Sequence, residues 1–283
     1  MNHQEPQPCQ TNRQSEVCDR LMPPETGIVV VGHGTADPVG AAETADTVAQ
    51  VAAILPNVPV ELGYLEVIEP TIAMAVERLA DRGCKKIIAI PILLFAAGHA
   101  KQDIPQALQD AVARHGLTVQ QAEPLGLHEQ IINLARRRFW EALKGRTPIQ
   151  GGSEAMLVIG RGSSDPTASQ QLWGFVRSTY SPLANVAKHR FAVSFVAAAK
   201  PSIDEAVTQL LQGDNSRQSV KRVVLHPHLL FHGHVEKQVD GHLEKAEIAY
   251  PSVEWVKVPR LGAAPEVAHA LVDRGLACLQ ARN

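Results

Sequence analysis

The stretch GIVVVGHGTADP, from Gly27 to Pro38, carries the pattern on which the whole chain is built. It opens with an unbroken apolar run rich in β-branched side chains, which is typical of a strand buried on both faces of a parallel sheet. A glycine-rich turn follows, and then Asp37 and Pro38, which favour the start of a helix. The segment therefore predicts a strand, a tight loop and a helix.

The same order returns in the second half of the chain as AMLVIGRGSSDP, from Ala155 to Pro166. Further along, IIAIPILLFAAGHAKQ (Ile87 to Gln102) resembles VVLHPHLLFHGHVEKQ (Val223 to Gln238), and a Leu-Gly pair precedes the last helical pattern of each half. Three matches in the same order indicate a duplicated domain rather than a short repeat.

Each half alternates apolar runs with helical patterns, which predicts an α/β fold. Strands are expected at 27–32, 58–65, 86–95 and 117–122, and again at 155–160, 190–198, 221–231 and 253–258. The helical pattern at 70–80 starts with Pro70 in a favourable first-turn position. The expected architecture is two tandem duplicated lobes, each with a mainly parallel four-stranded sheet flanked by helices.

Three segments divide the chain. Residues 1–26 are polar and rich in proline and glutamine, which predicts a disordered tail, and they lack the apolar run of a signal peptide. The two lobes are expected over 27–145 and 155–283, on either side of the polar linker KGRTPIQGGSE.

The composition is that of a soluble globular protein, with 45% hydrophobic and 20% charged residues. A formal net charge of -2 and only 4% aromatic residues argue against nucleic-acid binding, which needs a basic face and stacking rings. No apolar stretch reaches the roughly 18 residues that span a bilayer. We therefore expect a cytoplasmic protein with neither a nucleic-acid nor a membrane partner.

Two histidines follow strands of the first half. His33 comes after IVVVG and His99 after IPILLFAAG, so both lie at the carboxyl end of the sheet, where such folds bind ligands. Imidazole accepts protons and binds borderline divalent metals near neutral pH. The pair therefore indicates a metal or proton-transfer site, and the alternative is that each histidine only satisfies backbone groups of its loop.

Charged residues near these histidines are weaker candidates. Glu66, just past the second strand, could complete a metal site, while Glu69 stands before Pro70 in a helix-capping position. Lys101 could bind a substrate carboxylate or be an ordinary surface lysine. The run of Arg136, Arg137 and Arg138 is typical of a solvated helix face.

The segments VVVGHGTADPVGAAE, YLEVIEPTI and IPILLFAAGHAKQDIP resemble the motifs of the sirohydrochlorin chelatase family, the class II chelatases of the CbiX and SirB type. The resemblance implies insertion of a divalent metal, cobalt (favoured) or ferrous iron, into sirohydrochlorin, without ATP or an organic cofactor, on the route to cobalamin or siroheme. It assigns the active-site histidines to His33 and His99 and the glutamate to Glu66.

The second half departs from this pattern. Arg161 stands where the first half has His33, and the register of the prolines puts Ala197 in place of Glu66. Because arginine stays protonated and cannot bind a metal, we expect this lobe to have lost the chemistry. Arg161 is then a candidate for binding the carboxylates of the substrate. The histidines of HPHLLFHGH could form a second metal site, but an inherited strand end is favoured.

Two competing functions use the same features. Histidine phosphatases have a strand-end RHG motif, but Gly32 occupies the position of its arginine. A metal or tetrapyrrole carrier would share the histidine pair, and multiple turnover separates it from an enzyme. Since fusion of two lobes could replace a dimer, a monomer is expected.

Overall fold

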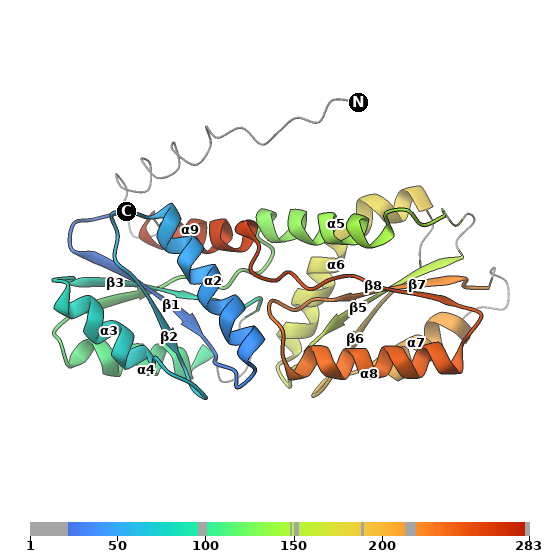
Figure 1. Cartoon of the computed structure of the whole chain (residues 1–283), viewed down its shortest axis with the longest axis horizontal. Helices are drawn as coiled ribbons and strands as arrows, with labels where there is room; N and C mark the ends of the chain where they lie inside the picture. Colours follow the sequence, from blue (N-terminus) through green and yellow to red (C-terminus); the bar gives the residue numbers. More distant parts are fainter. Residues whose placement is uncertain are drawn as a thin grey trace, which may run out of the picture.

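The structure, a computed structural model, describes residues 22–95, 101–147, 149, 153–187, 190–212 and 219–280. Two four-stranded sheets lie one beyond the other along the long axis of the molecule (Figure 1). Every strand pair in them is parallel. The strands are β1 (Thr26–Gly32), β2 (Val60–Tyr64), β3 (Lys86–Pro91), β4 (Thr118–Gln121), β5 (Glu154–Gly160), β6 (Arg190–Phe195), β7 (Arg222–Pro227) and β8 (Glu254–Lys257).

The two sheets have the same topology, in the orders β2-β1-β3-β4 and β6-β5-β7-β8. Helices join the strands in the same sequence in each half. They are α2 (Pro38–Ile54), α3 (Ile72–Asp81), α4 (Asp103–Ala113), α5 (Glu129–Leu143), α6 (Pro166–Ala187), α7 (Ile203–Gln212), α8 (His234–Ala249) and α9 (Pro265–Gln280). The predicted duplicated α/β architecture is confirmed. We call the sheet of β1 to β4 with its covering helices the first lobe, and that of β5 to β8 the second.

The unbroken apolar run of β1 is explained by burial on both faces of its sheet. Val29 and Val31 pack with residues of α3 and α4, while Ile28 and Val30 pack with residues of α2 and α9. All four side chains are fully buried, and each such burial contributes about 1.5–3 kcal/mol. The strand is therefore fixed from both sides, and its carboxyl end is held rigidly.

The last helix of each half packs on the sheet of the other half. α9 contacts α2, β3 and β4, whereas α5 contacts α6 and β8, an exchange that can be followed in Figure 1. The ring of Phe139 in α5 lies 5.5 Å from that of Tyr180 in α6, and Gly275 of α9 lies against Ile90 of β3. One hydrophobic core consequently runs through both lobes.

Two predicted details at the start of α3 are wrong. The helix begins at Ile72, and its N-cap is Thr71, whose side chain accepts from the Met74 amide. Pro70 instead follows a cis peptide bond, and its carbonyl accepts from the Tyr64 amide of β2 at 2.8 Å. The proline therefore extends the strand ladder rather than the helix, and Glu69 does not cap α3.

Other predicted boundaries and faces also change. The strand expected at 86–95 ends at Pro91, and the one expected at 221–231 ends at Pro227. The predicted helix start at Asp37 is confirmed, because its carboxylate accepts from the Val39 and Gly40 amides. The arginine run of α5 is not a solvated face: Arg136 donates to the Ser178 and Thr179 carbonyls of α6.

Within the part of the chain that the structure describes, none of the helices has the length and apolar character to span a membrane.

Candidate functional site

His33 and Glu66 lie at the carboxyl edge of the first sheet, in the loops that follow β1 and β2. The backbones of these loops continue the strand ladder, because the Leu65 amide donates to the Gly32 carbonyl and the Glu66 amide to that of His33. This brings Nδ1 of His33 to 3.4 Å from Oε1 of Glu66. Their side chains are 44% and 61% exposed, so a ligand can reach both.

Gly34 allows the two loops to approach so closely. Its φ is +103°, which side chains other than glycine rarely adopt, and a Cβ there would lie 1.9 Å from the Glu66 carbonyl oxygen. The glycine of the GHG motif is thus required by contact with the loop that carries Glu66. The sequence predicts a glycine-rich turn here, but not which segment lies against it.

His99 lies outside the described residues, as do its neighbours from 96 to 100. Its proposed part in the site stays a prediction. The segment that precedes these residues lies beside β1, the strand that leads to His33. β3 pairs with β1, and the Ile92 amide donates to the Val31 carbonyl.

The His33–Glu66 pair suits proton transfer or capture of a divalent cation. Imidazole binds borderline metals, and a carboxylate beside it balances the charge of the cation or orients the ring. Among the described residues no group of three histidine, cysteine or acidic side chains is positioned to hold a metal ion. The described part of the chain therefore offers two candidate ligands, and a third is predicted at His99.

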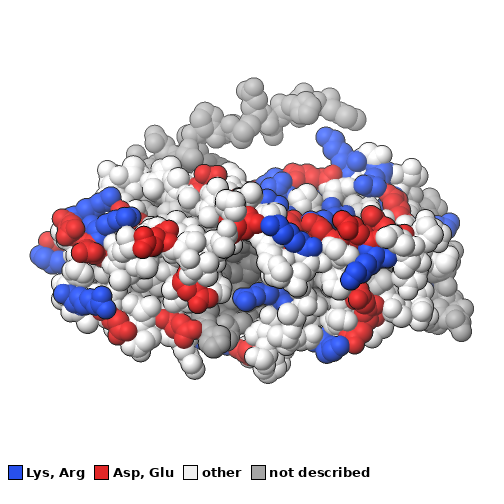
Figure 2. Space-filling view, turned by 60° about the horizontal axis from the view of Figure 1, so that its bottom comes forward, with Lys and Arg blue, Asp and Glu red and all other residues white. Residues whose placement is uncertain are grey.

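Lys101 contacts the opposite lobe. Its Nζ lies 2.7 Å from Oδ2 of Asp165, at the junction between the lobes. Hydrogen bonds from Lys101, then from Thr167, lower the pKa of Asp165 to about 2. On the face shown in Figure 2, basic and acidic side chains intermingle over both lobes. The ammonium of Lys101 thus already has an anionic partner. The substrate contact predicted for this lysine stays a prediction.

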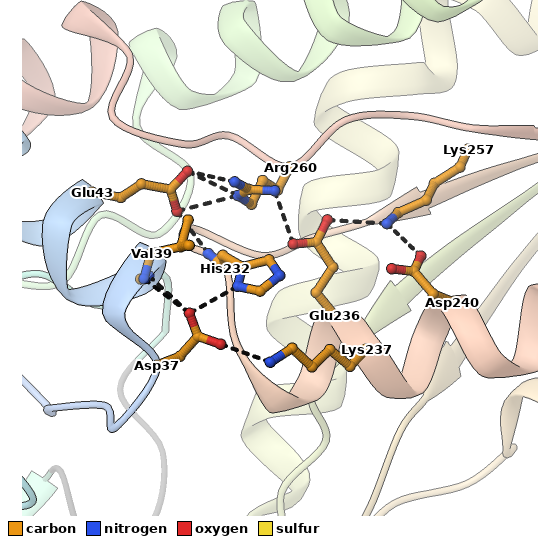
Figure 3. Close-up of polar contacts among 10 residues, drawn as sticks. Asp37, Val39, Glu43, His232, Glu236, Lys237, Asp240, Lys257 and Arg260 are labelled. Atoms are coloured by element: carbon orange, nitrogen blue, oxygen red, sulfur yellow. Dashed lines mark hydrogen bonds and ion pairs between the residues drawn. The ribbon is translucent and has the colours of Figure 1, made fainter.

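A wider set of ion pairs joins α2 to the second half of the chain (Figure 3). Asp37 is 2.8 Å from Lys237 and 3.0 Å from Nδ1 of His232. The hydrogen bonds from Lys237, then from His232, hold the pKa of Asp37 well below its usual range. The amide of His232 also donates to Glu43 at 2.7 Å.

Arg260 extends this set by binding Glu43 and Glu236 at once, at 2.6 and 2.9 Å. The hydrogen bond to Glu43 is the main cause that raises the pKa of Arg260. Glu236 also accepts from Lys257. The sequence does not predict the contact of Glu43 with Arg260, because nothing local links partners that lie in different halves of the chain.

The second lobe repeats the loop geometry with other side chains. The Ala197 amide donates to the Arg161 carbonyl at 3.0 Å, as Glu66 does to His33, so Arg161 and Ala197 occupy the two positions of the pair. Arg161 is exposed, and no acidic partner is found for it among the described residues. Lys200, by contrast, pairs with Glu205 at 2.7 Å.

The histidines of HPHLLFHGH separate into different environments. His226 and His228 are buried, with His226 joined to the Tyr180 hydroxyl at 2.5 Å and His228 stacked on Phe175 at 3.8 Å. Burial lowers both pKa values, that of His226 to about 3. His232 instead faces Asp37 across the junction. Because these histidines lie in different environments, the structure favours the interpretation that they only mark a strand end retained from the duplication, rather than a second metal site.

Comparison with known proteins places both halves in one family. The CbiX family model matches residues 27–142 and 155–276. A sirohydrochlorin cobaltochelatase of Priestia megaterium is 28% identical over 87% of this chain and 78% of its own length, and a sirohydrochlorin ferrochelatase of the same organism is 30% identical over 76% of each. The solved structure of SirB from Bacillus subtilis with Fe3+ is 26% identical, with a TM-score of 0.74, over 88% of this chain and 93% of that chain. Since the family model matches most of the sequence, in two consecutive regions, the chain belongs to the CbiX family.

Proposed function

We propose that the chain inserts a divalent metal ion into sirohydrochlorin, a polycarboxylated tetrapyrrole, without ATP or an organic cofactor. The observation that carries the proposal is the exposed His33–Glu66 pair, 3.4 Å apart at the carboxyl edge of the first sheet. The names of the relatives, cobaltochelatase and ferrochelatase, support it.

Metal insertion requires that two pyrrole N–H protons leave the macrocycle and that the metal ion exchanges its water ligands. A ring nitrogen of His33 can bind the cation or accept a proton, and Glu66 balances the charge and orients the ring. His99 is the proposed second imidazole. The two histidines then share the tasks of base and metal ligand on the open face of the macrocycle.

Cobalt is the proposed metal, in a route to cobalamin, and ferrous iron for siroheme is the alternative. Relatives carry both names, and imidazole with carboxylate accepts either ion. Metallation measured with each ion at equal concentration under anaerobic conditions decides between them.

The second lobe is proposed to hold the substrate. Arg161 is exposed at the position equivalent to His33, and a guanidinium binds carboxylates in a bidentate manner. Lys101 is a weaker candidate for the same task. We further propose that the duplicated units, 27–145 and 155–283, work together in one cytoplasmic monomer.

The experiment is multiple-turnover metallation, followed by the change in the absorption spectrum of the macrocycle. His33→Ala is expected to lower turnover by about 10²–10⁴-fold, and Glu66→Gln by about 10–100-fold. Full activity in His33→Ala contradicts the mechanism. A carrier would give at most one product per protein.

A matched control exists in the second half of the chain. His242 and Asp204 form another histidine–carboxylate pair, at 2.8 Å, between α8 and α7. His242→Ala is expected to leave turnover unchanged. An equal loss in both histidine variants would mean that the effect of His33→Ala is not specific to the site.

A further inference from the structure

Val67, the residue after Glu66, has an unfavourable backbone conformation. Its φ is +74°, and the Ile68 amide donates to the Glu66 carbonyl at 2.9 Å, so Val67 is the central residue of a three-residue γ-turn. This form of the γ-turn is rare and strained. A positive φ is a clear outlier for a β-branched residue, whereas glycine adopts it freely.

Burial of the side chain does not offset this strain. Val67 is 61% exposed, so most of its apolar surface remains in water. In the chain alone, valine thus combines strain with little gain from packing. Strained residues of this kind cluster at active sites and at positions that contact ligands.

The location of Val67 connects it to the proposed site. A Cβ built on Gly34 would lie 3.4 Å from the Cβ of Val67, so the valine lies against the turn that follows His33. Its neighbour in sequence, Glu66, pairs with that histidine. Val67 therefore flanks the His33–Glu66 pair on the same sheet edge.

The second lobe shows that the backbone conformation does not need valine. Ala198 has a φ of +55°, and its loop contacts Gly162 as the first loop contacts Gly34. A residue with positive φ thus occupies the equivalent loop position in both lobes, but only the lobe with His33 and Glu66 has a branched side chain there. This difference points to a ligand contact made by the side chain.

We infer that the Val67 side chain packs on the face of the bound macrocycle and holds its pyrrole nitrogens over the His33–Glu66 pair. The inference rests on the proposed function. The ring carbons around the central nitrogens of a tetrapyrrole form an apolar face, with the carboxylates at the rim, so exposed methyl groups match the face and the Arg161 guanidinium matches the rim.

The test uses three substitutions at Val67 in the full chain. Val67→Gly removes both the strain and the methyl groups: the melting temperature should rise by about 2–4 °C, while KM for sirohydrochlorin rises about 5–10-fold and kcat changes little. Val67→Thr keeps the shape and the strain but replaces a methyl by a hydroxyl, and should also raise KM. Val67→Ile should keep KM near that of the wild type.

Ala198→Gly is the matched control, since it removes a side chain from the equivalent positive-φ position of the second lobe. It should raise the melting temperature with a much smaller change in KM. If both Val67→Gly and Val67→Thr keep KM within twofold of the wild type, the inference is overturned. A fall in melting temperature for Val67→Gly would also overturn it, because the strain would then be absent.

Binding of metal-free sirohydrochlorin, followed by absorption, separates this inference from the proposed function. A wild type that binds the macrocycle but does not metallate it overturns the enzyme proposal alone, and the Kd values of the Val67 variants still test the contact. A wild type that does not bind the macrocycle overturns both.

Discussion

Lys101 forms an ion pair with Asp165 across the junction of the two lobes, with 2.7 Å between Nζ and Oδ2. The sequence repeat places Lys237 and Asp37 at the equivalent positions, and these two are joined at 2.8 Å. The duplication therefore produces a reciprocal contact, in which the lysine of each half binds the aspartate at the first helix of the other half. Both contacts join segments that follow the carboxyl ends of strands in the two sheets.

The two members of such a pair should differ in their effect on stability. Asp37→Ala is expected to lower the melting temperature more than Lys237→Ala, because Asp37 also accepts from two amides as N-cap of α2. The lysine variant loses only an exposed ion pair, and its small effect should vanish near about 1 M salt. Thermal unfolding at low and high salt measures this, and equal losses would contradict the additional role of Asp37.

Gly275 tests the exchange of the last helices. A Cβ on this residue of α9 would lie 2.8 Å from Cδ1 of Ile90 in β3. Gly275→Ala is therefore expected to destabilise the protein by about 1–3 kcal/mol, measured by denaturant unfolding. Adding Ile90→Val, which removes Cδ1, should recover part of the loss.

Gly241 is the control for that substitution, because it lies in α8 and a Cβ added there would contact nothing within 4 Å. Gly241→Ala should stabilise the protein by about 0.5–1 kcal/mol through helix propensity. If Gly275→Ala were equally stabilising, α9 would not pack on the first sheet as described.

The sequence predicted the elements of the fold better than their partners. The apolar run before Gly32 is a local signal, and it identified the strand that positions His33. The exchange of α5 and α9 has no such signal, because an amphipathic helix shows which of its faces is buried but not against which sheet. For the same reason the sequence predicts a solvated face for Arg136, although this residue donates to carbonyls of α6.

The candidate site was predictable to a similar extent. The positions of His33 and Glu66 at the ends of β1 and β2 follow from topology, since neighbouring parallel strands end at the same edge. The positive φ of Val67 was not predictable, because a β-branched residue is among the least expected in that conformation. Nor was the contact of Glu43 with Arg260, which depends on how the halves meet.

The two buried histidines of β7 and its end should make stability fall in acid. Burial lowers the pKa of His226 to about 3 and that of His228 as well, while an unfolded histidine titrates near about 6.5. Below that pH the unfolded chain binds more protons, so each histidine removes up to roughly 1.4 kcal/mol of stability per pH unit. This stability is fully present above the unfolded pKa and is lost as the pH falls toward the folded one.

His228→Phe keeps the stack on Phe175 and removes one titrating group. The free energy of unfolding should then fall less between about pH 7.5 and 5.5 than it does in the wild type. The difference is the contribution of His228, because His226 still titrates in the variant. Denaturant unfolding at the two pH values measures the difference. An unchanged loss would mean that His228 is protonated equally well in the folded protein.

Substitutions of Gly34 and Gly162 can distinguish an effect on the reaction from an effect on folding at the two equivalent loops. Both have positive φ, and a Cβ would lie 1.9 Å from the Glu66 carbonyl oxygen in one loop and 1.7 Å from that of Ala197 in the other. Alanine at either position should therefore cost more than about 1 kcal/mol of stability.

Only Gly34→Ala displaces the loop that holds Glu66 beside His33, so it should lower kcat strongly at a temperature where both variants are folded. Gly162→Ala should keep kcat and raise KM, because its loop carries the proposed substrate contact of Arg161. Equal kcat values in the two variants would contradict the division of the lobes into one for chemistry and one for binding.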